Sequence, residues 1–110
     1  MDLINIKILL GKKNDNSEDD VLAVLLTHSI QLINVYLGVT NLPQPLEFVA
    51  EQITIKKYNK LGSEGITTEN LGGISNSYSL DDLDEYKSIL DMYKDTELPQ
   101  KKTTNKLETL

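Results

Sequence analysis

Hydrophobic and polar residues recur with a helical period along most of this chain. In residues 18–37, leucine and isoleucine return every three or four positions, and valines widen the apolar face beyond one stripe. Residues 45–61 repeat the period with two apolar stripes, and lysines fall in the last turns, where the helix dipole favours positive charge. These spacings predict two helices, the first of them buried on more than one side, either in the core or against a second subunit.

The expected ends of these helices carry local signals. Ser17 with Asp20, and Ser79 with Asp82, have the spacing of capping boxes, and further acids fall in each first turn. Gly38 predicts a left-handed residue directly after the first long helix, since glycine is favoured there. Proline in the first turn of the next helix, at position 45, loses no hydrogen bond that the helix needs.

Two further segments complete the predicted architecture. Residues 2–10 fit a short helix or a strand, because apolar residues match both periods, and we favour a helix that ends at Gly11. The segment that starts at Ser79 predicts a surface helix with outward acids and an apolar stripe made of Leu83, Tyr86, Ile89 or Leu90, and Tyr93. We therefore expect a mainly α fold, a small bundle of about four helices over residues 1–95, and a flexible tail over residues 96–110, which lacks a sustained period.

The stretch NKLGSEGITTENLGGISNSYS, residues 59–79, interrupts this helical pattern and holds four of the six glycines. Gly62 is expected to end the third helix and Gly65 to allow a second sharp turn, because glycine reaches left-handed conformations at little cost. Residues on both sides of Gly72 and Gly73 suit extended backbone, which predicts a short β-hairpin or extended arm. A lone hairpin is only marginally stable in water, so it should pack on the bundle or pair with another chain.

Composition and charge narrow the function. The chain of 110 residues has no cysteine, which excludes disulfides, cysteine nucleophiles and thiolate metal sites. Its net charge is -6 and all 11 cations are lysines, which argues against tight or sequence-specific DNA binding. We expect no secretory signal and no membrane span, because Thr27, His28 and Gln31 interrupt the longest apolar candidate before it reaches about 20 residues.

Nothing in the sequence predicts a catalytic or cofactor site. His28, the only histidine, lies inside a predicted helix with no acid placed to form a catalytic triad. The acidic runs at residues 15–20 and 81–85 lack the spacing of calcium loops and are better explained as helix starts than as paired catalytic carboxylates. The segments LGSEG and LGGIS match no phosphate-binding motif. We expect no enzyme activity, no metal and no cofactor.

The succession of segments resembles the tailed-phage head-tail connector family, also called head-completion or DNA-packaging adaptor proteins. The segments are IKILLG, a polar acidic link, the long apolar helix, YNKLGSEGITTENLGGISNSY (Tyr58 to Tyr78), and LDEYKSILDMYK. The resemblance covers about residues 3–94. It implies a structural virion protein that forms an oligomeric ring, commonly of about a dozen subunits, beneath the portal of a filled capsid. Such a ring extends the DNA channel and binds the phage portal protein and a tail or stopper protein.

Under this resemblance, the possible inter-subunit or portal contacts are Ile66, Leu71, Ile74, Tyr78 and Tyr86. DNA would pass through the channel without sequence-specific binding. The protein would reside in the virion neck, after assembly in the host cytoplasm, and the isolated chain is expected to be monomeric. The alternative is a small helical regulatory or protein-interaction module that uses the same apolar faces. Discrete dimers in solution favour that alternative, whereas monomers that become rings favour the connector.

Overall fold

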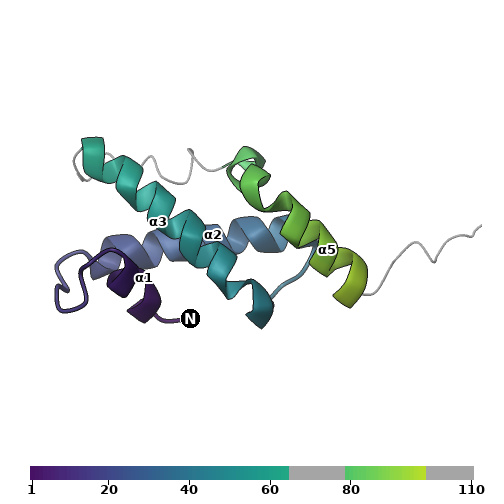
Figure 1. Ribbon diagram of the computed structural model, residues 1–110, viewed down its shortest axis with the longest axis horizontal. Helices are drawn as coiled ribbons and strands as arrows, with labels where there is room; N and C mark the ends of the chain where they lie inside the picture. Colours follow the sequence, from purple (N-terminus) through teal and green to yellow (C-terminus); the bar gives the residue numbers. More distant parts are fainter. Residues whose placement is uncertain (65–78, 99–110) are drawn as a thin grey trace, which may run out of the picture.

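The computed structural model describes residues 1–64 and 79–98, and within them the chain is a small helical bundle without strands (Figure 1). Its elements in chain order are α1 (Ile4–Leu9), α2 (Asp19–Leu37), the 3-10 turn η1 (Gln44–Leu46), α3 (Glu47–Glu64), the 3-10 segment η2 (Leu80–Tyr86) and α5 (Lys87–Glu97). The mainly α prediction is confirmed, and the segment 2–10 contains a helix, α1, rather than a strand.

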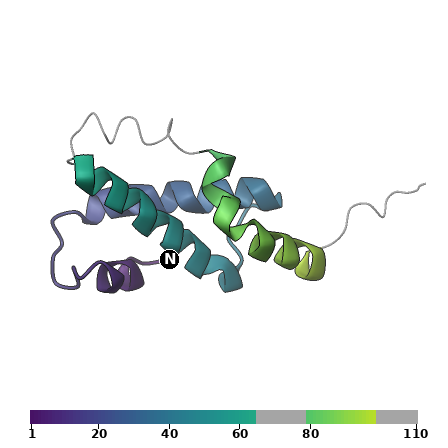
Figure 2. The same cartoon turned by 45° about the horizontal axis from the view of Figure 1, so that its top comes forward.

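The core lies where α3 crosses α2. Both views show α3 running diagonally over α2, with α1 near one end of α2 and α5 near the other (Figure 1, Figure 2). The buried side chains at this crossing are mostly leucine, isoleucine and valine: Leu22, Leu25, Leu26, Ile33, Leu37, Val49, Ala50 and Ile53. Ile6 of α1, Leu83 of η2 and Leu90 of α5 join the same cluster. Burying one such side chain stabilises the fold by about 1.5–3 kcal/mol.

Two buried hydroxyl groups meet inside this apolar crossing. Ser29 on α2 donates its hydroxyl proton to the carbonyl oxygen of Leu25 at 2.8 Å. Thr54 Oγ1 on α3 lies 2.8 Å from the carbonyl oxygen of Ala50 and 3.2 Å from Ser29 Oγ. Both hydroxyls therefore have partners, which removes most of the cost of burying them, and their contact fixes the register of α3 on α2.

The start of α2 corrects one predicted capping box. α2 begins at Asp19, its N-cap residue Glu18 makes no side-chain cap, and Ser17 lies outside the helix. The backbone N–H and the hydroxyl of Ser17 both donate to Asp15 Oδ1, at 2.9 and 2.7 Å. Aspartate side chains often bind nearby backbone and hydroxyl donors in this way. Here Ser17 is bonded within the turn before α2 and does not act as the N-cap that the spacing predicted.

Two other predicted helix ends are confirmed. At Ser79, the backbone N–H donates to Asp82 Oδ2 at 2.9 Å, and the reciprocal bonds of a capping box are present. Gly38 ends α2 with a φ of 73°, and its N–H and that of Val39 bond back to Asn34. That conformation strains any residue with a Cβ, which explains the glycine.

The end of α3 differs from the expectation for Gly62. The helix continues through this glycine and ends at Glu64, two residues later. A single glycine costs a helix only about 1 kcal/mol relative to alanine, so it does not by itself stop one that is well packed upstream. The predicted hairpin, with Gly65, Gly72 and Gly73, lies outside the described residues. So does most of the predicted tail, although α5 extends to Glu97.

The length and hydropathy of α2 correct the expectation that no segment is long enough for a membrane span. An 18-residue stretch of this 19-residue helix has a mean hydropathy of 1.4 and meets that criterion by length and composition, as core helices of soluble proteins also do. The polar residues that were expected to interrupt the span, Thr27, His28 and Gln31, do not lower the mean enough. In the structure one side of α2 packs against α3 at the centre of the bundle.

Candidate interaction surfaces

The outward side of α2 is exposed and, beyond Asp20 in its first turn, carries no charge. Residues 21–37 contain no aspartate, glutamate, lysine or arginine. Leu22, Ser29 and Ile33 point to the core, and the opposite side is a row of exposed residues that we call the α2 face: Ala23, Val24, Thr27, Gln31 and Val35. Val35 is 72% exposed. A surface helix usually carries charges on its outer side, so this row has unusually few charges for an exposed helix face.

The short helix α1 has a second uncharged exposed surface. Ile6 packs into the core, whereas Ile4, Ile8 and Leu9 are each more than half exposed; these three residues form the α1 face. The only charged residue of α1 is Lys7, which is buried and pairs with Asp19 at 3.0 Å. The α1 face is therefore apolar itself, and the carboxylates of Asp2, Glu47 and Glu51 lie beside Ile4 at its edge.

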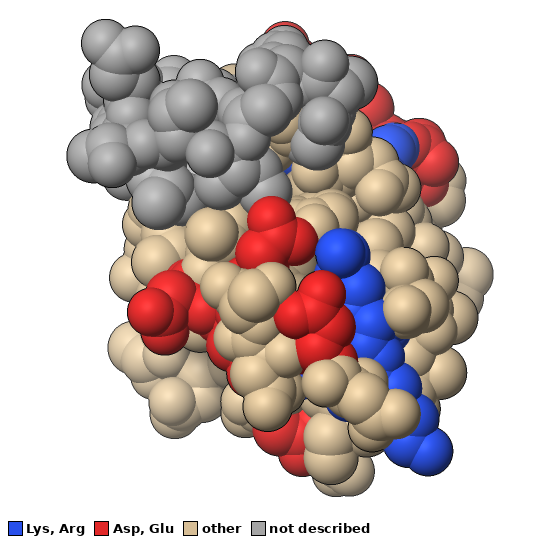
Figure 3. Space-filling model, turned by 90° about the vertical axis from the view of Figure 1, so that its left-hand side faces the viewer, with Lys and Arg blue, Asp and Glu red and all other residues tan. Residues whose placement is uncertain are grey.

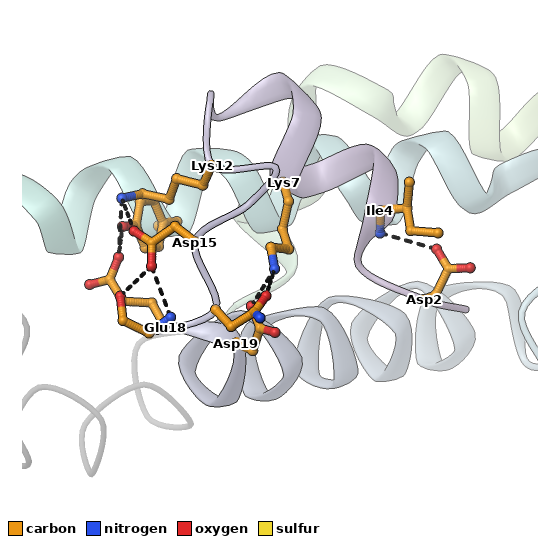
Figure 4. A network of polar contacts seen from close by, with 10 residues as sticks. Asp2, Ile4, Lys7, Lys12, Asp15, Glu18 and Asp19 are labelled. Carbon is orange, nitrogen blue, oxygen red and sulfur yellow. Dashed lines mark hydrogen bonds and ion pairs between the residues drawn. The ribbon is translucent and has the colours of Figure 1, made fainter.

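A polar network joins the α1–α2 link to α3 (Figure 4). Lys12 Nζ lies 3.5 Å from Glu18 Oε1 and 3.9 Å from Asp15 Oδ2, and it also lies over the ring of Tyr58. The Tyr58 hydroxyl donates to Glu18. Burial, and then this hydrogen bond, raise the pKa of Tyr58 above its usual value. Figure 3 shows this end of the molecule, where acidic and basic side chains lie next to one another.

A cleft of about 280 Å³ separates the end of α3 from η2. Its charged lining comes from both sides: Lys56, Lys57 and Lys60 on α3, and Asp81, Asp82, Asp84 and Glu85 on η2. Lys57 Nζ lies 3.0 Å from Asp82 Oδ2, and Lys56 pairs with Glu85. Asp82 thus serves the capping box and an ion pair at once. We call this cluster the ionic cleft; its charges hold η2 on α3 rather than leaving an open ligand site.

The residues expected at contacts are only partly placed by the structure. Tyr86 is half-buried at the end of η2, and its ring lies 5.9 Å from Lys56 Nζ. Burial raises the pKa of its hydroxyl. Ile66, Leu71, Ile74 and Tyr78 lie outside the described residues. The α1 face was not among the expected sites. The long apolar helix was expected to be buried on more than one side, in the core or against a second subunit, and in the isolated chain its α2 face is exposed.

The described residues show no arrangement suited to metal chemistry. Within residues 1–64 and 79–98, no group of three or more histidine, aspartate or glutamate side chains is placed to hold a metal ion. His28 is half-buried on α2.

The sequence profile of the phage gp6-like head-tail connector protein family matches residues 1–94. The chain belongs to this connector family. The match spans α1, α2, α3 and η2 and most of α5, so the uncharged faces and the ionic cleft all lie within it. The connector is accordingly a structural component of the phage neck, between head and tail. Comparison with curated proteins and with solved structures gives no match.

Proposed function

We propose that this connector protein is the subunit of an oligomeric ring that joins the phage portal to the tail and extends the DNA channel. The observation that carries the proposal is the pair of exposed, uncharged faces on α1 and α2. A ring subunit needs two different surfaces, one for each neighbour. Family membership over residues 1–94 supports the location in the neck.

The charge distribution supports a channel that lets DNA slide. Proteins that grip DNA neutralise its phosphates with clustered cations. This chain has a net charge of -6, and at least five of the eight lysines in the described residues are within 4 Å of a carboxylate: Lys7, Lys12, Lys56, Lys57 and Lys87. We therefore expect neither tight nor sequence-specific DNA binding, and no catalysis, from this ring.

The proposed partners are the portal protein on one side of the ring and a tail or stopper protein on the other. Tyr86 is half-buried, so part of its ring remains available for such a contact. Ile66, Leu71, Ile74 and Tyr78 are proposed for the same role from the family resemblance. The ring would form in the host cytoplasm during assembly, from chains that are monomeric when isolated, with about a dozen copies, as closed cyclic symmetry allows.

Mixing the connector with the purified portal ring of the same phage tests this function. We expect co-sedimentation and an extra ring of density on the portal in electron micrographs. A stable dimer of fixed mass that does not bind the portal would contradict the proposal and support a helical interaction module instead. Binding to a random DNA duplex, measured in parallel at low salt, should be weak and should not depend on sequence.

A further inference from the structure

We propose that the α1 face of one copy packs on the α2 face of the next copy. This inference rests on the proposed ring and names the two surfaces of its subunit contact. The α1 face consists of Ile4, Ile8 and Leu9, and the α2 face runs from Ala23 to Val35 on the outside of α2.

Charge singles out these two faces for contact between identical copies. Each copy has a net charge of -6, so surfaces rich in acids repel one another when two copies meet. Nine of the 18 residues in positions 80–97 are charged, which makes the η2–α5 side a poor surface for self-association. Residues 21–37 carry no charge, and the single cation of α1, Lys7, is already paired with Asp19. The nearest acids lie at the edges of the two faces: Asp20 in the first turn of α2, and Asp2, Glu47 and Glu51 beside Ile4. Both faces are therefore less charged than the η2–α5 side.

The positions of the two faces favour a head-to-tail contact. α1 and α3 lie on the same side of α2, in front of it in Figure 1 and below or across it in Figure 2. The α2 face is opposite the residues that pack on α3, such as Ile33, so it points away from that side. One copy therefore cannot cover its own α2 face with its own α1 face. Two different complementary patches on each subunit generate a closed ring when the rotation between copies closes.

The side chains of the two faces suit helix-on-helix packing. Ile4 and Ile8 are four residues apart and adjacent on one side of α1. Val24 and Val35 offer apolar surface on α2, while Thr27 and Gln31 between them can form hydrogen bonds at the rim. A lipid surface fits this row less well, because these two polar side chains occupy its middle and the more apolar side of α2 is already packed against α3.

Engineered cysteines test the contact directly, because the chain has no native cysteine. Ile8→Cys and Val35→Cys variants, mixed under mild oxidation, should form a mixed disulfide dimer. The control is a mixture of Met92→Cys with Val35→Cys. The test mixture should react at least about tenfold faster than the control, because a specific contact holds the two cysteines together more often than chance collision does. Met92 is also highly exposed, on α5. A chain with both Ile8→Cys and Val35→Cys should give a ladder of linked oligomers. Equal rates for the two mixtures would overturn the proposal.

Charge variants separate this inference from the ring function itself. Ile8→Lys and Val35→Glu should each abolish ring formation on the portal, and the mixture of the two variants should restore it, because opposite charges then meet at alternate contacts. Circular dichroism verifies that each variant is folded. Rings formed by each variant alone as well as by the wild type would overturn the inference while leaving the ring function intact. Failure of the wild type to form rings would instead contradict the function.

The same variants distinguish two other binding partners for the α2 face, the portal protein and a lipid surface. If Val35→Glu blocks portal binding while the disulfide rate of the control mixture equals that of the test mixture, the face binds the portal and the inference fails. Flotation of the wild type with phosphatidylcholine vesicles, lost in Val35→Glu, would assign the face to lipid and also overturn the inference. Absence of flotation, together with selective disulfide formation, supports the contact between copies.

Discussion

α2 and the η2–α5 segment bury similar residues but expose very different ones. Both place fully buried side chains in the common core, Ile33 from α2 and Leu83 and Leu90 from η2 and α5. Residues 21–37 have no charge, whereas half of residues 80–97 are charged. The buried positions explain why each segment folds onto the bundle. The exposed positions indicate whether its outer side remains in water or is covered by another molecule.

The two segments also differ in how they are attached. α2 meets α3 along a continuous apolar crossing that encloses the paired hydroxyls of Ser29 and Thr54. η2 and α5 have fewer buried anchors and add ion pairs to α3, and exposed ion pairs contribute only about 0–1 kcal/mol each. A hydrogen bond of 2.6 Å from the Tyr36 hydroxyl to Asp91 Oδ1 joins α5 to α2. We therefore expect η2–α5 to open locally at a lower free energy than the α2–α3 crossing.

The strongest test of this comparison is a pair of truncations on α2. Ile33→Ala should lower the free energy of unfolding by about 2–5 kcal/mol, because it leaves a cavity at the centre of the crossing. Val35→Ala, two residues away and 72% exposed, should change it by less than about 0.5 kcal/mol in the isolated chain. Urea denaturation followed by circular dichroism measures both. Equal losses would mean that the outer side of α2 is buried in the isolated chain, against the comparison.

The ionic cleft provides the next test, on the charged segment. Lys57 and Asp82 are mostly buried, with 13% and 26% of their side chains exposed, whereas Lys56 and Glu85 are more than half exposed. Lys57→Met should therefore cost about 1 kcal/mol, and Lys56→Met should cost almost nothing. Hydrogen exchange of the η2 and α5 amides measures the local effect. The difference between the two variants should shrink at high salt, and a difference that persists would show that packing rather than charge holds η2.

The two serine-led turns allow a smaller, matched comparison. Ser79 caps η2 together with Asp82, so Ser79→Ala should destabilise this segment by about 1 kcal/mol. Ser17 has the same sequence signature but does not cap α2, so Ser17→Ala should cost clearly less. Thermal unfolding of the two variants gives the ranking. A larger loss of stability in Ser17→Ala than in Ser79→Ala would indicate that Ser17 does cap α2, as the sequence predicted.

These serines show how far the sequence predicts the fold. Periodicity located the helices, and Gly38 and Ser79 marked their ends, because these signals depend on neighbouring residues alone. The role of Ser17 could not be predicted, since it depends on which donors Asp15 takes. Similarly, the spacing did not decide whether Ile89 or Leu90 belongs to the apolar stripe. The structure shows that Leu90 is the buried one, because of how α5 packs on the bundle. The α1 face was missed for the same reason, because the exposed side of a helix is known only once its neighbours are in place. The sequence did predict a second covered side for α2, but not which residues form it.

The smallest expected effect concerns Asp15, at the charged end of α2. The hydroxyl of Ser17, and then its backbone N–H, lower the pKa of Asp15 below the ordinary value of 3.8. Because the folded state favours the charged carboxylate, this contribution is present above pH 3.8 and is lost as the pH falls through the lower folded pKa. In Ser17→Ala the pKa of Asp15 should rise, but only in part, since the backbone donor remains. An NMR titration of the Asp15 carboxyl carbon measures the change. A wild-type pKa at or above 3.8 would show that this turn does not form in solution, and Ser17 would then be free to cap α2.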